Sequence, residues 1–115
     1  MTLDRELRRA VGPFSRKADL GSPTLASYEI AFRDLPEKVR EALGKPHKNT
    51  SNRQNVFYEV PTKGRRVFLA YYRWKVPLRV KPARFEIGIN LLDADGEVLG
   101  FGSVDDDTDE VSWSA

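Results

Sequence analysis

The residues best suited to chemistry with a partner form one basic stretch that is interleaved with aromatic residues. Between Val60 and Phe85 the chain holds eight bases and no acid, and Tyr71, Tyr72 and Trp74 lie among these bases. Cations displace counterions from phosphate groups, and exposed aromatic rings stack on nucleobases. This combination predicts a surface that binds nucleic acid or another acidic partner.

The predicted binding residues follow a strand and the segments on either side of it. Neighbouring residues of a strand face opposite ways, so Tyr71 shares a face with Arg73 and Lys75, whereas Tyr72 and Trp74 share a more apolar face that we expect in the core. The predicted nucleic-acid or partner site consists of Arg65, Arg66, Tyr71, Arg73, Lys75, Arg79, Lys81 and Arg84. A purely structural interpretation stays open, in which these bases pair with neighbouring acids and keep a sheet edge soluble.

The charge of the chain is divided between its two parts, although the net charge is only +2. Residues 1–84 carry 19 bases and 8 acids, whereas residues 85–115 carry 9 acids and no base. Clustered charge of one sign indicates the kind of partner rather than the fold. Pairing between neighbouring strands would neutralise part of this division, so only some of the bases are expected to serve a partner.

Two acidic segments raise the question of a metal site. Asp105, Asp107 and Asp109 have the alternating spacing of a calcium loop, and a shorter acidic segment spans 93–96. Glu110 stands where a calcium loop needs glycine, and no bidentate glutamate follows at the required distance. Aspartates of this kind are common in turns. We therefore predict no metal site and no cofactor.

The chain offers few residues for catalysis. It has no cysteine and one histidine, His47, and none of the ten residues after His47 is an acid that could orient its ring. We therefore expect a protein without catalytic activity. A small ribonuclease remains an alternative, in which Tyr71 and Arg73 would position and stabilise a phosphate transition state.

Length and composition favour one domain over residues 1–115. The chain has 115 residues, of which 40% are hydrophobic, enough for one core, and a peripheral position for residues 1–23 is left open. No apolar run approaches the roughly 20 residues of a membrane-spanning helix. The first residues lack the apolar centre of a secretory signal. We predict a cytoplasmic protein that makes no membrane contact, and its oligomeric state is left open.

Two short helices are predicted from capping residues and apolar spacing. The first covers 2–10 with Thr2 as its N-cap. The second lies within 34–44, where Asp34 would cap the first turn and Glu37 would complete a capping box.

The remaining elements are predicted to be strands. Alternating apolar residues place one strand at 25–32, and the second half of the chain contains further strands near 56–60, 66–76, 85–91, 97–104 and 111–113. Turns are expected at 62–64 and 93–96, and Pro77 and Pro82 place the segment 78–81 at an edge or bulge. The predicted fold is α+β, with one or two short helices packed on a curved antiparallel sheet of about five strands in meander order.

One segment resembles a known family. Residues 28–44 read as a strand with Tyr28, Ile30 and Phe32 followed by a helix that opens with Leu35 and Pro36. This resembles the beginning of small bacterial toxins of the mRNA-cleaving, ribosome-associated type. Those toxins have two helices before the sheet, and they place basic or aromatic catalytic residues on the sheet and near the C-terminus. Here the second helix is missing and the C-terminal part is acidic, so no site residue is transferred.

The sequence thus predicts a small non-catalytic binding module that contacts nucleic acid or another acidic surface. The main alternative is a protein-partner module, such as an inhibitor, immunity or assembly factor. Such a module would bind through a sheet edge or through its two charged regions.

Overall fold

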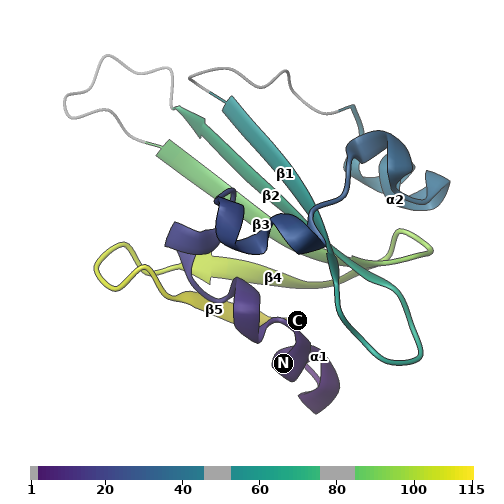
Figure 1. The fold of residues 1–115 in the computed structure, drawn as a ribbon, viewed down its shortest axis with the longest axis horizontal. Coiled ribbons are helices and arrows are strands. Elements are labelled where there is room, and N and C mark those ends of the chain that lie inside the picture. Colours follow the sequence, from purple (N-terminus) through teal and green to yellow (C-terminus); the bar gives the residue numbers. More distant parts are fainter. Residues whose placement is uncertain (1–2, 46–52, 76–84) are drawn as a thin grey trace.

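The computed structural model describes residues 3–45, 53–75 and 85–115, and within them a single five-stranded antiparallel sheet (Figure 1). The strands are β1 (Arg53–Val60), β2 (Val67–Lys75), β3 (Phe85–Asp93), β4 (Val98–Val104) and β5 (Val111–Ser114). They lie side by side in sequence order, which makes the sheet a meander. The predicted α+β fold with a meander of about five strands is therefore confirmed.

Short helices occupy the chain before the sheet. The α-helices are α1 (Arg5–Ala10) and α2 (Glu37–Leu43), and the 3-10 helices are η1 (Gly12–Phe14), η2 (Lys17–Asp19), η3 (Pro23–Tyr28) and η4 (Phe32–Asp34). None is long enough to be stable alone in water, so each depends on packing against the sheet.

Strand β2 shows how the sheet divides the molecule. Its residues alternate between two faces, and both faces are buried along most of the strand: Leu69 is fully enclosed on one side and Phe68 is 1% exposed on the other. We call the side that carries Leu69 the α1 face and the side that carries Phe68 the α2 face.

The α1 face packs against the N-terminal segment. Leu7, Val11 and Phe14 are buried against it together with Tyr58 and Leu69 of the sheet. The Phe14 and Tyr58 rings lie 5.3 Å apart between centroids, a distance at which aromatic pairs attract each other. Residues in the range 1–23, for which a peripheral position was left open, thus supply part of a core.

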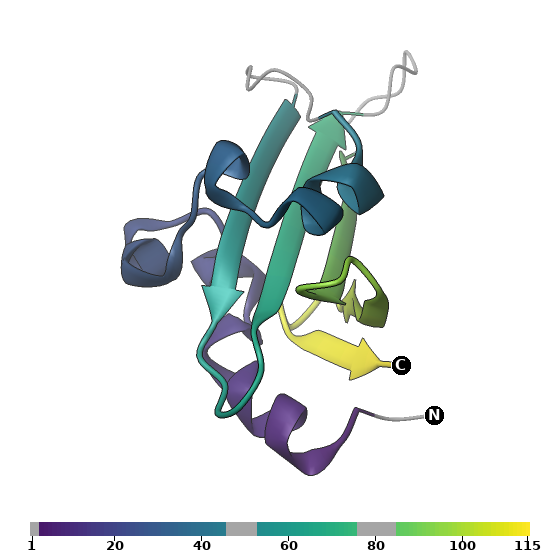
Figure 2. The same cartoon turned by 90° about the vertical axis from the view of Figure 1, so that its right-hand side faces the viewer.

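The α2 face carries a second, smaller core. Leu35 and Val39 pack there with Phe57, Phe68 and Leu92, and Figure 2 shows α2 in front of strand β2. The two cores on opposite faces explain why β2 is nearly continuously apolar from Val67 to Tyr72.

The prediction of a strand at 25–32 is wrong, because most of this segment is helical or irregular. Pro23 opens the 3-10 helix η3, and afterwards Glu29 forms only an isolated bridge with Tyr58. The physical reason is that this segment serves both cores: Tyr28 packs with the α1-face cluster, whereas Ile30 packs with the α2-face cluster. The alternation of Tyr28 and Ile30 therefore does not indicate one buried face of a strand. It arises because this segment passes around the edge of β1 and contacts both cores.

The predicted helix starts also need correction. The N-cap of α1 is Asp4, whose carboxylate accepts a 2.8 Å hydrogen bond from the Leu7 amide, while Thr2 lies outside the described residues. Helix α2 begins at Glu37 after Pro36, and no side chain caps it. A capping box needs its glutamate at the third helical position, and Glu37 occupies the first.

The predicted turns are confirmed, because Gly64 and Gly96 both adopt positive φ between paired strands. The segment 78–81 and His47 lie outside the described residues. Among the helices that the structure describes, none has the length and apolar character needed to span a bilayer.

Candidate functional site

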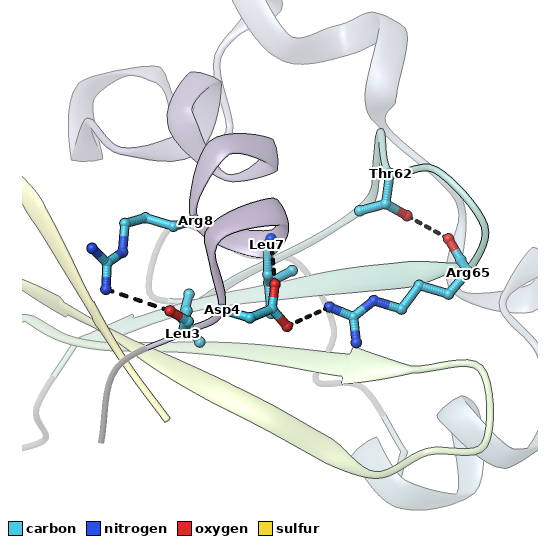
Figure 3. Close-up of polar contacts among 6 residues, drawn as sticks. All are labelled: Leu3, Asp4, Leu7, Arg8, Thr62 and Arg65. Atoms are coloured by element: carbon cyan, nitrogen blue, oxygen red, sulfur yellow. Dashed lines mark hydrogen bonds and ion pairs between the residues drawn. The ribbon is translucent and has the colours of Figure 1, made fainter.

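Arg65, the first predicted binding residue, is held by an ion pair within the protein. Its guanidinium lies 2.8 Å from the Asp4 carboxylate (Figure 3). The same carboxylate caps α1 through Leu7. The amide hydrogen bond from Leu7, followed by the Arg65 guanidinium, lowers the pKa of Asp4 below its ordinary value. Arg65 therefore joins the β1–β2 hairpin to α1.

Arg66 also has an internal partner. Its guanidinium donates two hydrogen bonds, of 2.9 and 3.1 Å, to the Glu59 carboxylate on the facing strand. It also lies 5.0 Å from the centre of the Phe68 ring. These bonds hold the pKa of Glu59 below its usual range. The structural interpretation, in which bases pair with neighbouring acids, thus describes both hairpin arginines.

Tyr71 does not present its ring to a partner. Its side chain is only 2% exposed in the α1-face core, and burial raises the pKa of its hydroxyl. The exposed position that the sequence suggested is wrong, because the N-terminal segment covers this face of β2. A ring enclosed in this way cannot stack on a base.

The remaining predicted residues are only partly described. Arg73 is half-buried on β2 and makes an interaction of its own, so it is not a free cation. For Lys75 the structure gives the backbone position opposite Phe85. Arg79, Lys81 and Arg84 lie outside the described residues.

The described members of the predicted site do not come together. Arg65 and Arg66 precede β2, whereas Arg73 and Lys75 lie near its far end. The strand runs from Val67 to Lys75, which spans about 26 Å at the usual rise per residue. The two groups therefore belong to opposite ends of the sheet.

Tyr72 and Trp74, which were expected in the core, are both partly exposed on the α2 face. The Tyr72 ring packs edge-on against Phe57 at 6.2 Å. Both rings lie over Gly88, where an added Cβ would meet each of them at 3.8 Å. Helix α2 covers only part of this face, so the Tyr72 and Trp74 side chains remain partly exposed to solvent.

An open cleft of about 520 Å³ lies between α1 and the β1–β2 hairpin. Figures 1 and 2 both show α1 beside this hairpin at one end of the sheet. The cleft is lined by Arg5, Glu6, Arg9, Ala10, Pro13, Pro61, Thr62 and Lys63. We call it the α1–hairpin cleft.

The cleft is basic. Arg5 and Arg9 are four residues apart on α1 and therefore neighbours on its surface, and Lys63 stands across from them on the hairpin. In the part of the chain that the structure describes, none of these three cations takes part in an ion pair. Glu6 is the one acid of the lining. The arrangement therefore attracts an anion.

Arg5, Arg9 and Lys63 were not among the binding residues predicted from the sequence, although a signal for the two arginines exists. Within the predicted helix, Leu3 and Leu7 mark one face by their spacing of four, and Arg5 and Arg9 repeat that spacing on another face. The approach of the hairpin to this helix could not be read from local pattern. It depends on the contact between Asp4 and Arg65, 61 positions apart.

The acidic segments form turns. The Asp93 carboxylate accepts amide hydrogen bonds from Asp95 and Glu97, and the Asp105 carboxylate does the same for Asp107 and Thr108. Within the described ranges, no three or more acidic or histidine side chains are grouped so that they could hold a metal ion.

Among the described residues, two ion pairs join the acidic C-terminal part to bases earlier in the chain. They connect Lys17 to Asp106 and Lys38 to Asp95, at 3.9 and 3.8 Å. Both acids are largely exposed, so these pairs contribute little to stability.

No protein-family model matches this chain, and no curated protein or solved structure matches it at a significant level. The resemblance of residues 28–44 to ribosome-associated toxins loses its basis as well, because the strand on which it rested is absent.

Proposed function

We propose that this protein is a small binding module, without catalysis of its own, that engages the phosphate backbone of a nucleic acid through the basic end formed by α1 and the β1–β2 hairpin. The observation that carries the proposal is the convergence of Arg5, Arg9 and Lys63 on one cleft without an ion-pair partner among the described residues. We propose the cytoplasm as its compartment, which suits a chain without cysteine.

Electrostatics support this assignment of the partner. Arginine and lysine contacts to phosphates release condensed counterions and provide most of the affinity of sequence-independent binding. A cation already bound to a carboxylate contributes less, because the ligand must first displace that carboxylate. The three cations of the cleft are therefore better placed for this role than Arg65 and Arg66, which have carboxylate partners.

The proposal predicts binding of single-stranded RNA that weakens steeply with salt. For single strands, log K falls by about 0.7 per neutralised phosphate for each decade of salt. Substituting Arg5, Arg9 or Lys63 by glutamine should therefore reduce the slope, by at most about 0.7 each. Fluorescence anisotropy of a labelled oligonucleotide, between about 50 and 200 mM salt, measures this slope.

Arg33→Gln is the matched control, because Arg33 is an exposed arginine in η4, away from the cleft, and makes no ion pair among the described residues. It should leave the slope unchanged. An affinity that does not change with salt concentration would contradict the proposal. A combined Arg79→Gln, Lys81→Gln and Arg84→Gln variant tests the other basic segment. If this variant loses binding while the Arg5, Arg9 and Lys63 variants keep it, the binding site does not lie in the cleft.

A protein-partner module is the second candidate, and one observation favours it. Val98 and Phe101 on β4 are 52% and 49% exposed, so this strand presents apolar surface that a protein partner could cover. Recovery of a bound partner from extract before and after nuclease treatment separates the two candidates. A partner that survives nuclease and is lost in Phe101→Ser favours a protein; one lost with nuclease favours nucleic acid.

The structure offers no comparable support for a ribonuclease. Tyr71 is enclosed in the core and its raised pKa opposes ionisation, so it is poorly placed to act on a phosphate. RNA that remains intact with the purified protein, with or without ribosomes, would remove this alternative.

A further inference from the structure

We propose that the α1–hairpin cleft is a pocket for a single terminal nucleotide, in which Arg5, Arg9 and Lys63 hold an end phosphate while the base lies against the apolar wall of Ala10, Pro13 and Pro61. This inference rests on the proposed nucleic-acid function and specifies the part of the ligand that the cleft receives.

The shape of the cleft points to a strand end. Its volume of about 520 Å³ falls within the range of pockets that enclose small molecules. A duplex, or the middle of a strand, presents its phosphates along an extended backbone, whereas one terminal nucleotide can enter a cleft of this size.

The charge of the lining favours a phosphomonoester. Three cations and the single carboxylate of Glu6 give the lining a net charge of about +2. A terminal phosphomonoester carries close to two negative charges at neutral pH, by analogy with phosphorylated side chains whose second pKa is about 6. A phosphate within a strand carries only one, so the terminal group matches the cleft better.

The other wall suits a nucleobase. Ala10 and Pro13 on the helical side, with Pro61 on the hairpin, present aliphatic surface without a charge. A flat base that packs against such a surface removes apolar area from water, which favours binding. Phosphate-binding and apolar groups therefore occur in the same cleft, as one nucleotide requires.

The cleft is held open by contacts that the ligand does not use. The 2.8 Å ion pair between Asp4 and Arg65 fixes the hairpin to the start of α1, and the Thr62 hydroxyl donates to the Arg65 carbonyl within the hairpin (Figure 3). Because its walls are tied together before binding, little ordering remains to be done when the ligand enters.

The test compares hexanucleotides of one sequence that end in a 5′-phosphate, a 3′-phosphate or only hydroxyl groups. One of the phosphorylated forms should bind on the order of tenfold more tightly than the hydroxyl form, the value of one hydrogen bond to a charged group. The preferred form identifies the strand end. Adenosine monophosphate should compete for the same site.

Glu6→Gln provides a gain-of-function variant that misfolding cannot imitate. Removing this carboxylate from the lining should tighten binding of the phosphorylated hexanucleotide by about 1.5-fold to fivefold, since one repulsive charge is lost at an exposed site. Arg9→Gln should abolish the preference for the phosphorylated end. Arg33→Gln should keep it.

Equal binding of all three hexanucleotides, with steep salt dependence retained, would overturn this inference and leave the proposed function standing. Failure of every hexanucleotide and of longer single strands to bind at low salt would overturn both. Ala10→Leu, which fills the cleft without removing charge, should weaken the phosphorylated form specifically; unchanged affinity with an intact circular dichroism spectrum would contradict the placement of the base.

Discussion

Asp4 is the residue at which local structure, packing and the candidate site meet. Its carboxylate completes the first turn of α1 by accepting from Leu7 and holds the hairpin through Arg65. One short side chain thus positions both walls of the α1–hairpin cleft. The cations that matter for binding are those that form no ion pair among the described residues, whereas Arg66, which is paired with Glu59, matters mainly for structure.

The lowered pKa of Asp4 predicts a pH-dependent contribution to stability. A carboxyl whose folded pKa lies below its unfolded value stabilises the protein fully above that value, here 3.8, and loses this contribution as the pH falls through the folded pKa. Asn can still cap a helix, so Asp4→Asn removes mainly the charge. The melting temperature of wild type should therefore exceed that of Asp4→Asn at neutral pH, and the difference should close at acid pH.

Thermal unfolding of both proteins across this pH range measures the effect. Asp34→Asn is the control, because Asp34 is an exposed carboxylate with no ion pair among the described residues. A difference between wild type and Asp4→Asn that stays constant with pH would show that the Asp4 charge does not stabilise the fold.

At the scale of elements, the β3–β4 turn is fitted closely to α2. A Cβ added to Gly96 would come within 2.4 Å of the Lys38 carbonyl oxygen, and its φ of +83° is one that side chains rarely adopt. Gly64 in the β1–β2 hairpin has nearly the same φ, +80°, but open space around it. Substituting Gly64 therefore tests backbone strain alone, whereas substituting Gly96 tests backbone strain together with close packing.

Gly64→Ala should cost about 1–2 kcal/mol of unfolding free energy, the strain of an alanine at positive φ. Gly96→Ala should cost at least about 1 kcal/mol more, because the turn must also move away from α2. Urea denaturation measures both values. Equal costs for the two variants would mean that the turn does not rest on α2.

Much of the element order could be predicted from the sequence, because alternation and glycine turns are local signals. The turns at Gly64 and Gly96 are the clearest examples. The strand at 25–32 failed because alternation was taken to mean one buried face, whereas Tyr28 and Ile30 belong to different cores. The burial of Tyr71 could not be predicted either, since it depends on which distant segment covers each face.

The sequence predicted a basic binding surface, but it did not predict where on the fold that surface would lie. A basic surface was expected, but Arg65 and Arg66 have carboxylate partners and lie at the opposite end of β2 from Lys75. Two of the three cations that line the cleft, Arg5 and Arg9, come from α1, and no local sequence pattern encodes how close α1 lies to the hairpin.

At the scale of the whole molecule, the sheet separates two hydrophobic cores that share strand β2. Leu69 belongs to the larger core and Phe68 to the smaller, and both are nearly inaccessible to solvent. Because consecutive residues of one strand bury opposite sides, loss of either core should destabilise the other.

Leu69→Ala should cost about 2–5 kcal/mol and Phe68→Ala about 3–5 kcal/mol of unfolding free energy. Both variants should unfold in a single transition, because β2 couples the cores. Phe101→Ala, at a site 49% exposed, should change stability by less than about 0.5 kcal/mol. Calorimetry with two separate transitions in either core variant would contradict this coupling.

The basic end around α1 and the β1–β2 hairpin is the surface that we propose binds a phosphate-bearing strand. The most direct test of this binding is the proton–nitrogen NMR spectrum of the labelled protein, titrated with a single-stranded oligonucleotide at low salt. Binding at this end predicts that the largest shifts affect the backbone amides of Arg5, Arg9, Ala10 and Lys63. Shifts confined to Arg73 and Lys75, or to the acidic turns, or no shifts at all, would contradict it.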